Sequence, residues 1–157
     1  RNMELFQVIE DGEGIEGAIL RALPARPGQE SRVSERHPAL LVVSPRAAEQ
    51  GMPLPRQCRM ALVPGALTVP LRAASAVSYG ASPRDSLTIS SREGNILWAA
   101  LQRELVTVDG RVVERQEFPL NLAPGEGELS ALATAGALLL LGVPPEELGP
   151  AAGGWKT

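Results

Sequence analysis

The chain is poor in cysteine, histidine and aromatic residues. Among its 157 residues, Cys58 is the only cysteine and His37 is the only histidine. An internal disulfide and a thiolate metal cluster are therefore excluded, and one Cys with one His cannot bind zinc without help from carboxylates. Aromatic residues make up only 3% of the chain, which leaves few rings for stacking on nucleic-acid bases. Aliphatic side chains must form the core.

The chain also lacks an excess of positive charge and a long hydrophobic run. Its net charge of -3 opposes contact with phosphate backbones, which need a basic surface. The apolar stretch 129–143 is shorter than the roughly 18–20 residues of a membrane span. We therefore expect a cytoplasmic protein with no nucleic-acid partner and no membrane contact. The opening Arg1-Asn2-Met3 leaves two alternatives, a native start at Met3 or a fragment of a longer chain.

The length and the composition are those of one globular domain. The hydrophobic fraction of 44% and the charged fraction of 21% are close to globular averages. We expect a single domain over residues 1–157, with a loose tail at 149–157. A strand at 4–9, a short helix at 18–23 and an apolar run at 39–43 predict a βαβ unit, whose last strand is buried on both faces.

The middle of the chain predicts more strands. The apolar runs 59–63 and 74–79 each end at proline or glycine, which favours strands, and residues 66–73 between them predict a short helix. Alternating residues at 86–118 predict an antiparallel meander, with Asp109-Gly110 as a hairpin turn between strands.

Within this meander, the pattern predicts one long strand at 96–108 and a returning strand at 111–118. The apolar segment 128–141 then predicts a buried helix that ends at Gly142. Together the elements predict a three-layer α/β fold: a mostly parallel sheet, extended by the antiparallel β-meander, with helices packed outside.

A glycine-rich motif follows the first expected strand. Gly12, Gly14 and Gly17 match G-x-G-x-x-G between a strand and a helix, which is the context of a nucleotide-binding turn. Neighbouring carboxylates would repel phosphate, so an acidic glycine-rich loop is the simpler interpretation. Glu10 and Asp11 offer an alternative role as ligands of Mg²⁺, against an ordinary solvated pair of acids.

A polar loop follows the strand expected at 74–79. Tyr79, Ser82, Arg84 and Asp85 combine hydroxyl groups, a guanidinium and a carboxylate, and ligands of α/β proteins bind beyond the carboxyl ends of strands. These four residues are the predicted ligand-binding site, and a turn capped by Ser82 and Asp85 is the alternative. No nucleophile lies in a recognisable frame around the one histidine, so catalytic residues stay unknown.

Several segments resemble the central region of the Mur ligase family, the ATP-dependent enzymes that join amino acids to peptidoglycan precursors. The resemblance rests on residues 6–11 (FQVIED), 39–45 (ALLVVSP), 76–82 (AVSYGAS) and 131–147. It implies an α/β fold. The Gly-Lys-Thr/Ser loop that binds ATP in this family is absent, as are its histidine motif and its C-terminal domain, so activation of a carboxylate by ATP is not implied.

These observations favour a non-catalytic binding or protein-interaction module without a cofactor, with a homo-oligomer or another protein as partner. This hypothesis depends on the lack of a complete catalytic or metal motif rather than on a positive signal. The alternatives are a nucleotide-binding enzyme and a reduced Mur-ligase-like domain.

Overall fold

The computed structural model describes residues 6–23, 38–55, 57–67 and 71–149. Within these residues it has nine strands, three α-helices and a short 3₁₀ helix. The elements in chain order are β1 (Phe6–Ile9), α1 (Ile15–Ala22), β2 (Leu40–Val43), α2 (Pro45–Gln50), β3 (Gln57–Pro64), β4 (Arg72–Gly80), β5 (Leu87–Glu93), β6 (Ile96–Leu101), β7 (Leu105–Val106), β8 (Val112–Val113), β9 (Gln116–Asn121), α3 (Glu128–Leu140) and η1 (Pro145–Glu147).

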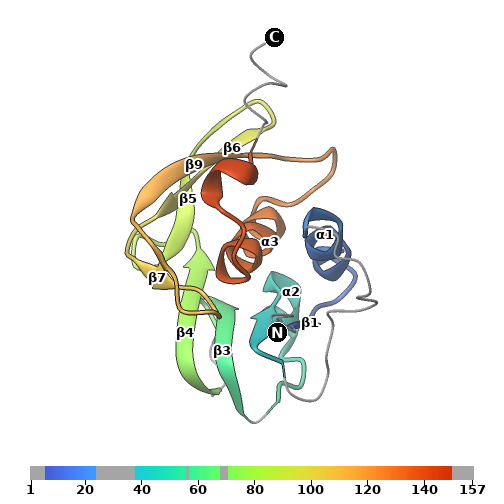
Figure 1. Cartoon of the computed structure of the whole chain (residues 1–157). Helices are drawn as coiled ribbons and strands as arrows, with labels where there is room; N and C mark the ends of the chain where they lie inside the picture. The colour runs from blue at the N-terminus through green and yellow to red at the C-terminus, as the bar shows by residue number, and fades with distance from the viewer. Residues whose placement is uncertain (1–5, 24–37, 56, 68–70, 150–157) are drawn as a thin grey trace.

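Seven strands form one mixed sheet in the order β1-β2-β3-β4-β5-β6-β9, so the prediction of an α/β fold is confirmed at this level (Figure 1). Strands β1 to β5 pair in parallel, whereas β5 pairs with β6 and β6 with β9 in antiparallel fashion. Strands β7 and β8 form a separate two-stranded hairpin. No helix in the described ranges is long and apolar enough to cross a membrane.

The connection between β4 and β5 is unusually short for parallel strands. Crossovers between such strands usually need a dozen or more residues, whereas here only residues 81–86 intervene. The two strands pair only at Tyr79↔Leu87 and Gly80↔Thr88. Because β5 overlaps β4 only at the end of β4 and then continues beyond it, the chain does not have to return along the length of the sheet.

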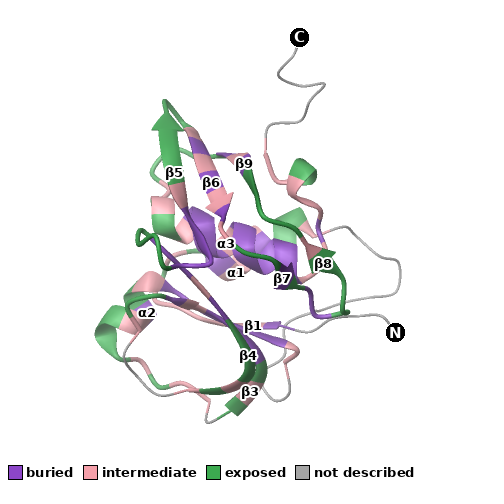
Figure 2. Cartoon of the chain, turned by 90° about the vertical axis from the view of Figure 1, so that its left-hand side faces the viewer, coloured by how far each residue is buried: buried purple, intermediate pink, exposed green. Residues whose placement is uncertain are grey.

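The main core lies between the sheet and helix α3, which packs against β2, β3, β4 and β5 and also against α1. Most of α3 is buried, as Figure 2 shows by its purple colour. The helix approaches the sheet closely at Gly136, where an added Cβ would lie 3.0 Å from Leu62 Cδ2 and 3.2 Å from Leu87 Cδ2. The absence of a side chain at this position is what permits the short helix-to-sheet distance.

A second, smaller apolar cluster involves the alternate residues of β2. Leu40 and Val42 belong to the main core, whereas Leu41 and Val43 contact Ala47 of α2. Side chains on a strand alternate between its two faces, so β2 is buried on both, as the run at 39–43 predicts. Helix α2 itself is not among the predicted elements.

Two predictions for the middle of the chain are wrong. Of the helix expected at 66–73, residues 68–70 lie outside the described part, and no helix is present in the rest, because β4 begins at Arg72. The long strand expected at 96–108 is interrupted after Leu101. The β5–β6 pairing ends at Gln102: its backbone N–H still donates to Ser86 O at 2.8 Å, and its side-chain amide donates to Pro83 O and Asp85 O.

The hairpin predicted at Asp109-Gly110 is confirmed. Leu105 pairs with Val113 and Val106 with Val112, and Gly110 has the left-handed φ of 93° that the turn requires. The two strands are shorter than predicted, because the chain leaves the hairpin at Glu114 and joins the main sheet only at β9. The tail predicted at 149–157 lies, apart from Gly149, outside the described residues.

Candidate functional site

The glycine-rich turn after β1 is occupied by a side chain of its own. Glu10 accepts hydrogen bonds from the backbone N–H groups of Ile15 at 2.7 Å and Glu16 at 3.1 Å. These groups form the start of α1, where a pyrophosphate would have to bind. Gly12 and Gly14 have left-handed φ values of 71° and 75°, so the glycines serve the turn, and a nucleotide would have to displace the carboxylate of Glu10.

The other acidic side chains of this loop bind α2. Asp11 forms an ion pair with Arg46 at 3.4 Å and accepts a hydrogen bond from the Gln50 side chain at 2.8 Å. Glu13 accepts from the backbone N–H groups of Asp11 and Arg46. Gly17 lies one turn further on, inside α1. In the part of the chain that the structure describes, no three metal-ligating side chains come together, and Glu10 and Asp11 point to different partners.

Tyr79 is fully buried at the end of β4. Its hydroxyl group donates a hydrogen bond of 2.6 Å to the backbone carbonyl of Val43 at the end of β2. Burial, with a smaller contribution from the negative charge of Glu13, raises the pKa of this phenol far above its ordinary value. Tyr79 therefore ties together two strand ends two positions apart in the sheet and has no free donor for a ligand.

Asp85 lies where β3 and β4 end. Its side chain accepts a hydrogen bond from Ser82 N at 3.1 Å, and its backbone N–H donates to Ser82 O. The carboxylate is so close to two glycines that an added Cβ would lie 2.0 Å from Asp85 Oδ1 at Gly65 and 2.6 Å from Oδ2 at Gly80. With 4% of Asp85 exposed, the side chain fills the space between these strand ends.

The four predicted ligand-binding residues differ in their surroundings. Tyr79 and Asp85 are buried and bonded to the backbone, whereas Arg84 is exposed, and its backbone N–H donates to Ser82 Oγ. This arrangement is that of the capped turn, the alternative interpretation of the same residues. Such a turn is what the short connection from β4 to β5 needs.

Replacing Tyr79 with phenylalanine tests this bond. The variant leaves the buried carbonyl of Val43 without its donor, so we expect the free energy of unfolding to fall by about 1–2 kcal/mol near pH 7. Urea unfolding followed by circular dichroism measures the change. An unchanged free energy of unfolding would contradict the role given to the hydroxyl group.

The same pair of proteins has a predictable pH dependence. In the unfolded chain Tyr79 ionises near its ordinary pKa of 10.0, whereas in the folded chain burial raises that pKa. The native protein is therefore expected to lose stability relative to Tyr79→Phe only above pH 10, by about 1.4 kcal/mol per pH unit at most. Urea titrations of both proteins between pH 8 and pH 11 measure this difference.

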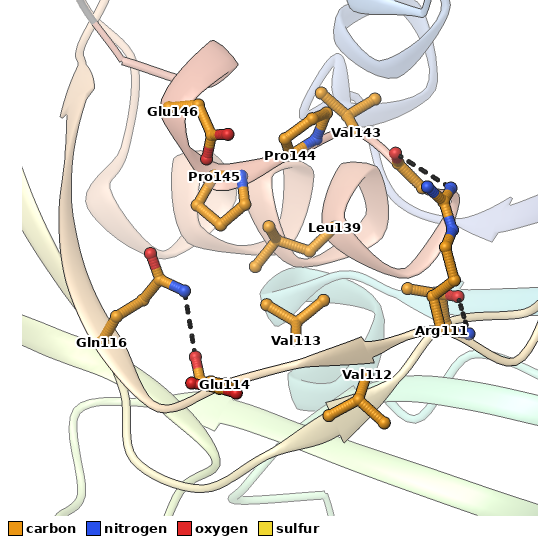
Figure 3. Close-up of a pocket in the computed structure, with 12 residues that line it drawn as sticks. Arg111, Val112, Val113, Glu114, Gln116, Leu139, Val143, Pro144, Pro145 and Glu146 are labelled. Carbon is orange, nitrogen blue, oxygen red and sulfur yellow. Dashed lines mark hydrogen bonds between the residues drawn. The ribbon is translucent and has the colours of Figure 1, made fainter.

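A pocket with a volume of about 360 Å³ lies elsewhere, between the β7–β8 hairpin and the end of α3 (Figure 3). One wall is the extended segment 111–116, and the other is the segment 139–146, which contains the last turn of α3 and the start of η1. Further along, Gly149 lies so close to β9 that an added Cβ would be 2.2 Å from the carbonyl oxygen of Pro119. The chain beyond α3 thus follows the edge of the sheet.

The floor of this pocket is apolar. Leu139 and Val143 are buried, and Pro144, Pro145 and Val113 are half-buried. Figure 3 shows Val113 and Leu139 turned toward one another from opposite walls. Ligand pockets are lined mainly by apolar side chains of this kind, because these side chains provide most of the binding affinity.

Hydrogen bonds hold the two walls at a fixed separation. Val108 N donates to Leu140 O at 2.8 Å, and Arg111 Nη2 donates to Gly142 O at 3.4 Å. Arg59 of β3 also donates to Val108 O at 3.1 Å. The hairpin is therefore attached both to α3 and to the main sheet, so the pocket does not depend on a ligand to form it.

The turn of the hairpin carries its own network. The Thr107 hydroxyl group donates to Asp109 and accepts from the backbone N–H of Arg111. The hydrogen bond from Thr107, followed by the charge of Arg111, lowers the pKa of Asp109. Asp109 also forms an ion pair of 3.3 Å with Arg111, so the guanidinium at this end of the pocket already has an acidic partner.

The pocket is not among the sequence predictions, although both segments that form it are. The sequence predicts the hairpin and the helix end, but their approach depends on contacts between residues about thirty positions apart, such as Val108 with Leu140. No motif marks such an approach. Comparisons with protein-family models and with curated proteins find no match to this chain.

Proposed function

We propose that this chain is a non-catalytic binding module, which takes a side chain of a protein partner into the pocket between β8 and the end of α3. The observation that carries this proposal is the combination of an apolar floor, a polar rim and fixed walls. Its volume of about 360 Å³ is at the lower end of the range for ligand pockets, about 300–1,000 Å³, and suits one anchoring side chain.

The environment of the polar residues supports a role without catalysis. Glu10 and Asp85 accept hydrogen bonds from the backbone, and Tyr79 donates one. Groups that hold a fold together in this way are not free to exchange protons with a substrate. Burial raises the pKa of the Cys58 thiol, which disfavours the nucleophilic thiolate.

For the architecture we propose a single three-layer domain, in which α1 and α3 lie on one face of the sheet and α2 on the other. This arrangement is supported by the side chains of β2, which alternate between the two apolar clusters on opposite faces of the sheet. The same fold agrees with a reduced Mur-ligase-like domain, which stays a proposal resting on the sequence resemblance alone. For partners, we propose another protein or a second copy of this chain rather than nucleic acid.

Two-dimensional NMR of isotope-labelled protein with a panel of blocked dipeptides tests the pocket. We expect shift changes confined to residues 107–116 and 139–146. Val113→Phe fills the pocket from the strand wall and should weaken binding at least tenfold, or about 1.4 kcal/mol. Val106→Phe is the matched control, because Val106 lies on the same hairpin, is 49% exposed and does not line the pocket.

The nucleotide-binding alternative predicts a different pattern. With ATP and Mg²⁺, or with NAD, it requires shift changes at residues 10–17 and 80–85, and these should disappear in Gly14→Val. Such a result, together with no response of the pocket to any dipeptide, would replace the binding-module proposal with the nucleotide-binding one.

A further inference from the structure

The charges on the pocket rim are unevenly compensated. Three charged residues line the pocket, namely Arg111, Glu114 and Glu146. Arg111 has Asp109 as its ion-pair partner. In the described ranges, no Lys or Arg nitrogen lies within 4.0 Å of the carboxylate of Glu114 or of Glu146. With Arg111 neutralised by Asp109, the rim has a surplus of negative charge.

The two uncompensated carboxylates belong to opposite walls. Glu114 directly follows β8, whereas Glu146 belongs to η1 and lies beside Pro145 in Figure 3. The apolar floor formed by Val113 and Leu139 lies between these walls. The pocket therefore combines an apolar floor with two exposed acidic residues that have no cationic partner among the described residues.

We infer that the side chain taken up by the pocket is cationic and has an aliphatic stem, as arginine has. This inference rests on the proposed function and specifies its ligand. The methylene groups would pack on Val113, Leu139 and Pro145. The guanidinium would donate hydrogen bonds to the carboxylates of Glu114 and Glu146. Long basic side chains combine an apolar stem and a charged end in this way, and arginine is frequent among the anchoring residues of protein interfaces.

Other ligand classes fit the pocket less well. An anionic ligand would meet Glu114 and Glu146 and would have to take Arg111 from Asp109 at 3.3 Å. A purely apolar side chain would fill the floor but would leave both carboxylates without a partner. A guanidinium offers five N–H donors in a fixed plane, so it can bond two carboxylates at once.

Three blocked tripeptides test this inference by NMR titration of the full chain: Ala-Arg-Ala, Ala-citrulline-Ala and Ala-norleucine-Ala. Citrulline keeps the shape of arginine without its charge, and norleucine keeps only the aliphatic stem. We expect the arginine peptide to bind about tenfold more tightly than either of the others, and its affinity to fall as salt is raised from low to physiological concentration.

Charge-neutral variants show which groups cause the preference. The double variant Glu114→Gln/Glu146→Gln should bind the three peptides equally, whereas Glu49→Gln, an exposed carboxylate of α2, should keep the preference for arginine. Equal binding of all three peptides to the native pocket would overturn the charge inference and leave the pocket as a binding site. No response of the pocket to any peptide would overturn the inference together with the proposed function.

Discussion

Replacing Gly136 with valine is expected to lower the free energy of unfolding by about 3 kcal/mol, with a fall in melting temperature of about 10 °C. The first added carbon already meets Leu62 at 3.0 Å and Leu87 at 3.2 Å. The two further methyl groups of valine have no space unless α3 moves away from the sheet. Urea unfolding and differential scanning calorimetry measure the two quantities.

Gly136→Ala separates the packing effect from helix propensity. Alanine adds only the Cβ, and its tight contact with Leu62 is offset by the gain in helix propensity, about 1 kcal/mol. We expect this variant to stay within about 1 kcal/mol of the native protein. Leu62→Ala in the valine variant should recover part of the loss, because the shorter side chain creates room. If Gly136→Val unfolds like the native protein, α3 does not approach β3 as described.

The second large effect is expected for Gly65→Ala. The new methyl group would be 2.0 Å from Asp85 Oδ1 and 2.8 Å from Cγ. Asp85 cannot move aside without losing the hydrogen bond from Ser82 N. We expect a loss of about 2–3 kcal/mol of unfolding free energy, measured by urea titration.

Two comparisons separate this clash from a general cost of removing glycine. Gly17→Ala makes the same chemical change inside α1, where the nearest atom is the flexible end of Arg21 at 3.3 Å, and should raise stability by up to about 1 kcal/mol. In Asp85→Ala, the additional cost of Gly65→Ala should largely vanish. Equal costs of Gly65→Ala with and without Asp85 would show that the carboxylate is not the obstacle.

The elements that depend on local chemistry could be predicted from the sequence. The run Leu40–Val43 and the Asp109-Gly110 turn have patterns that are typical of a buried strand and of a hairpin. Helix α2 also has a local sequence pattern from which it can be predicted. Ser44 caps it, Pro45 begins it and Gly51 ends it with a φ of 66°.

The sequence predictions fail where the local structure depends on contacts with residues far away in the chain. The strand expected at 96–108 ends at Leu101, and the next residue, Gln102, bonds to Pro83, Asp85 and Ser86, which are about 16–19 residues away. Glu10, for which the sequence offers a metal-ligand role only as an alternative, accepts hydrogen bonds from the first N–H groups of α1. A carboxylate in a loop has the same sequence pattern in both roles, and only its distance from backbone N–H groups separates them.

The position of α3 has a consequence for protein synthesis. The helix that covers β2, β3, β4 and β5 is made of residues 128–140, long after the strands themselves have been made. During synthesis, one apolar face of the sheet therefore stays exposed to solvent until α3 has left the ribosome. This face contains Leu40, Val42 and Leu62. During this interval the nascent sheet is the form of this protein most exposed to aggregation and most dependent on chaperones.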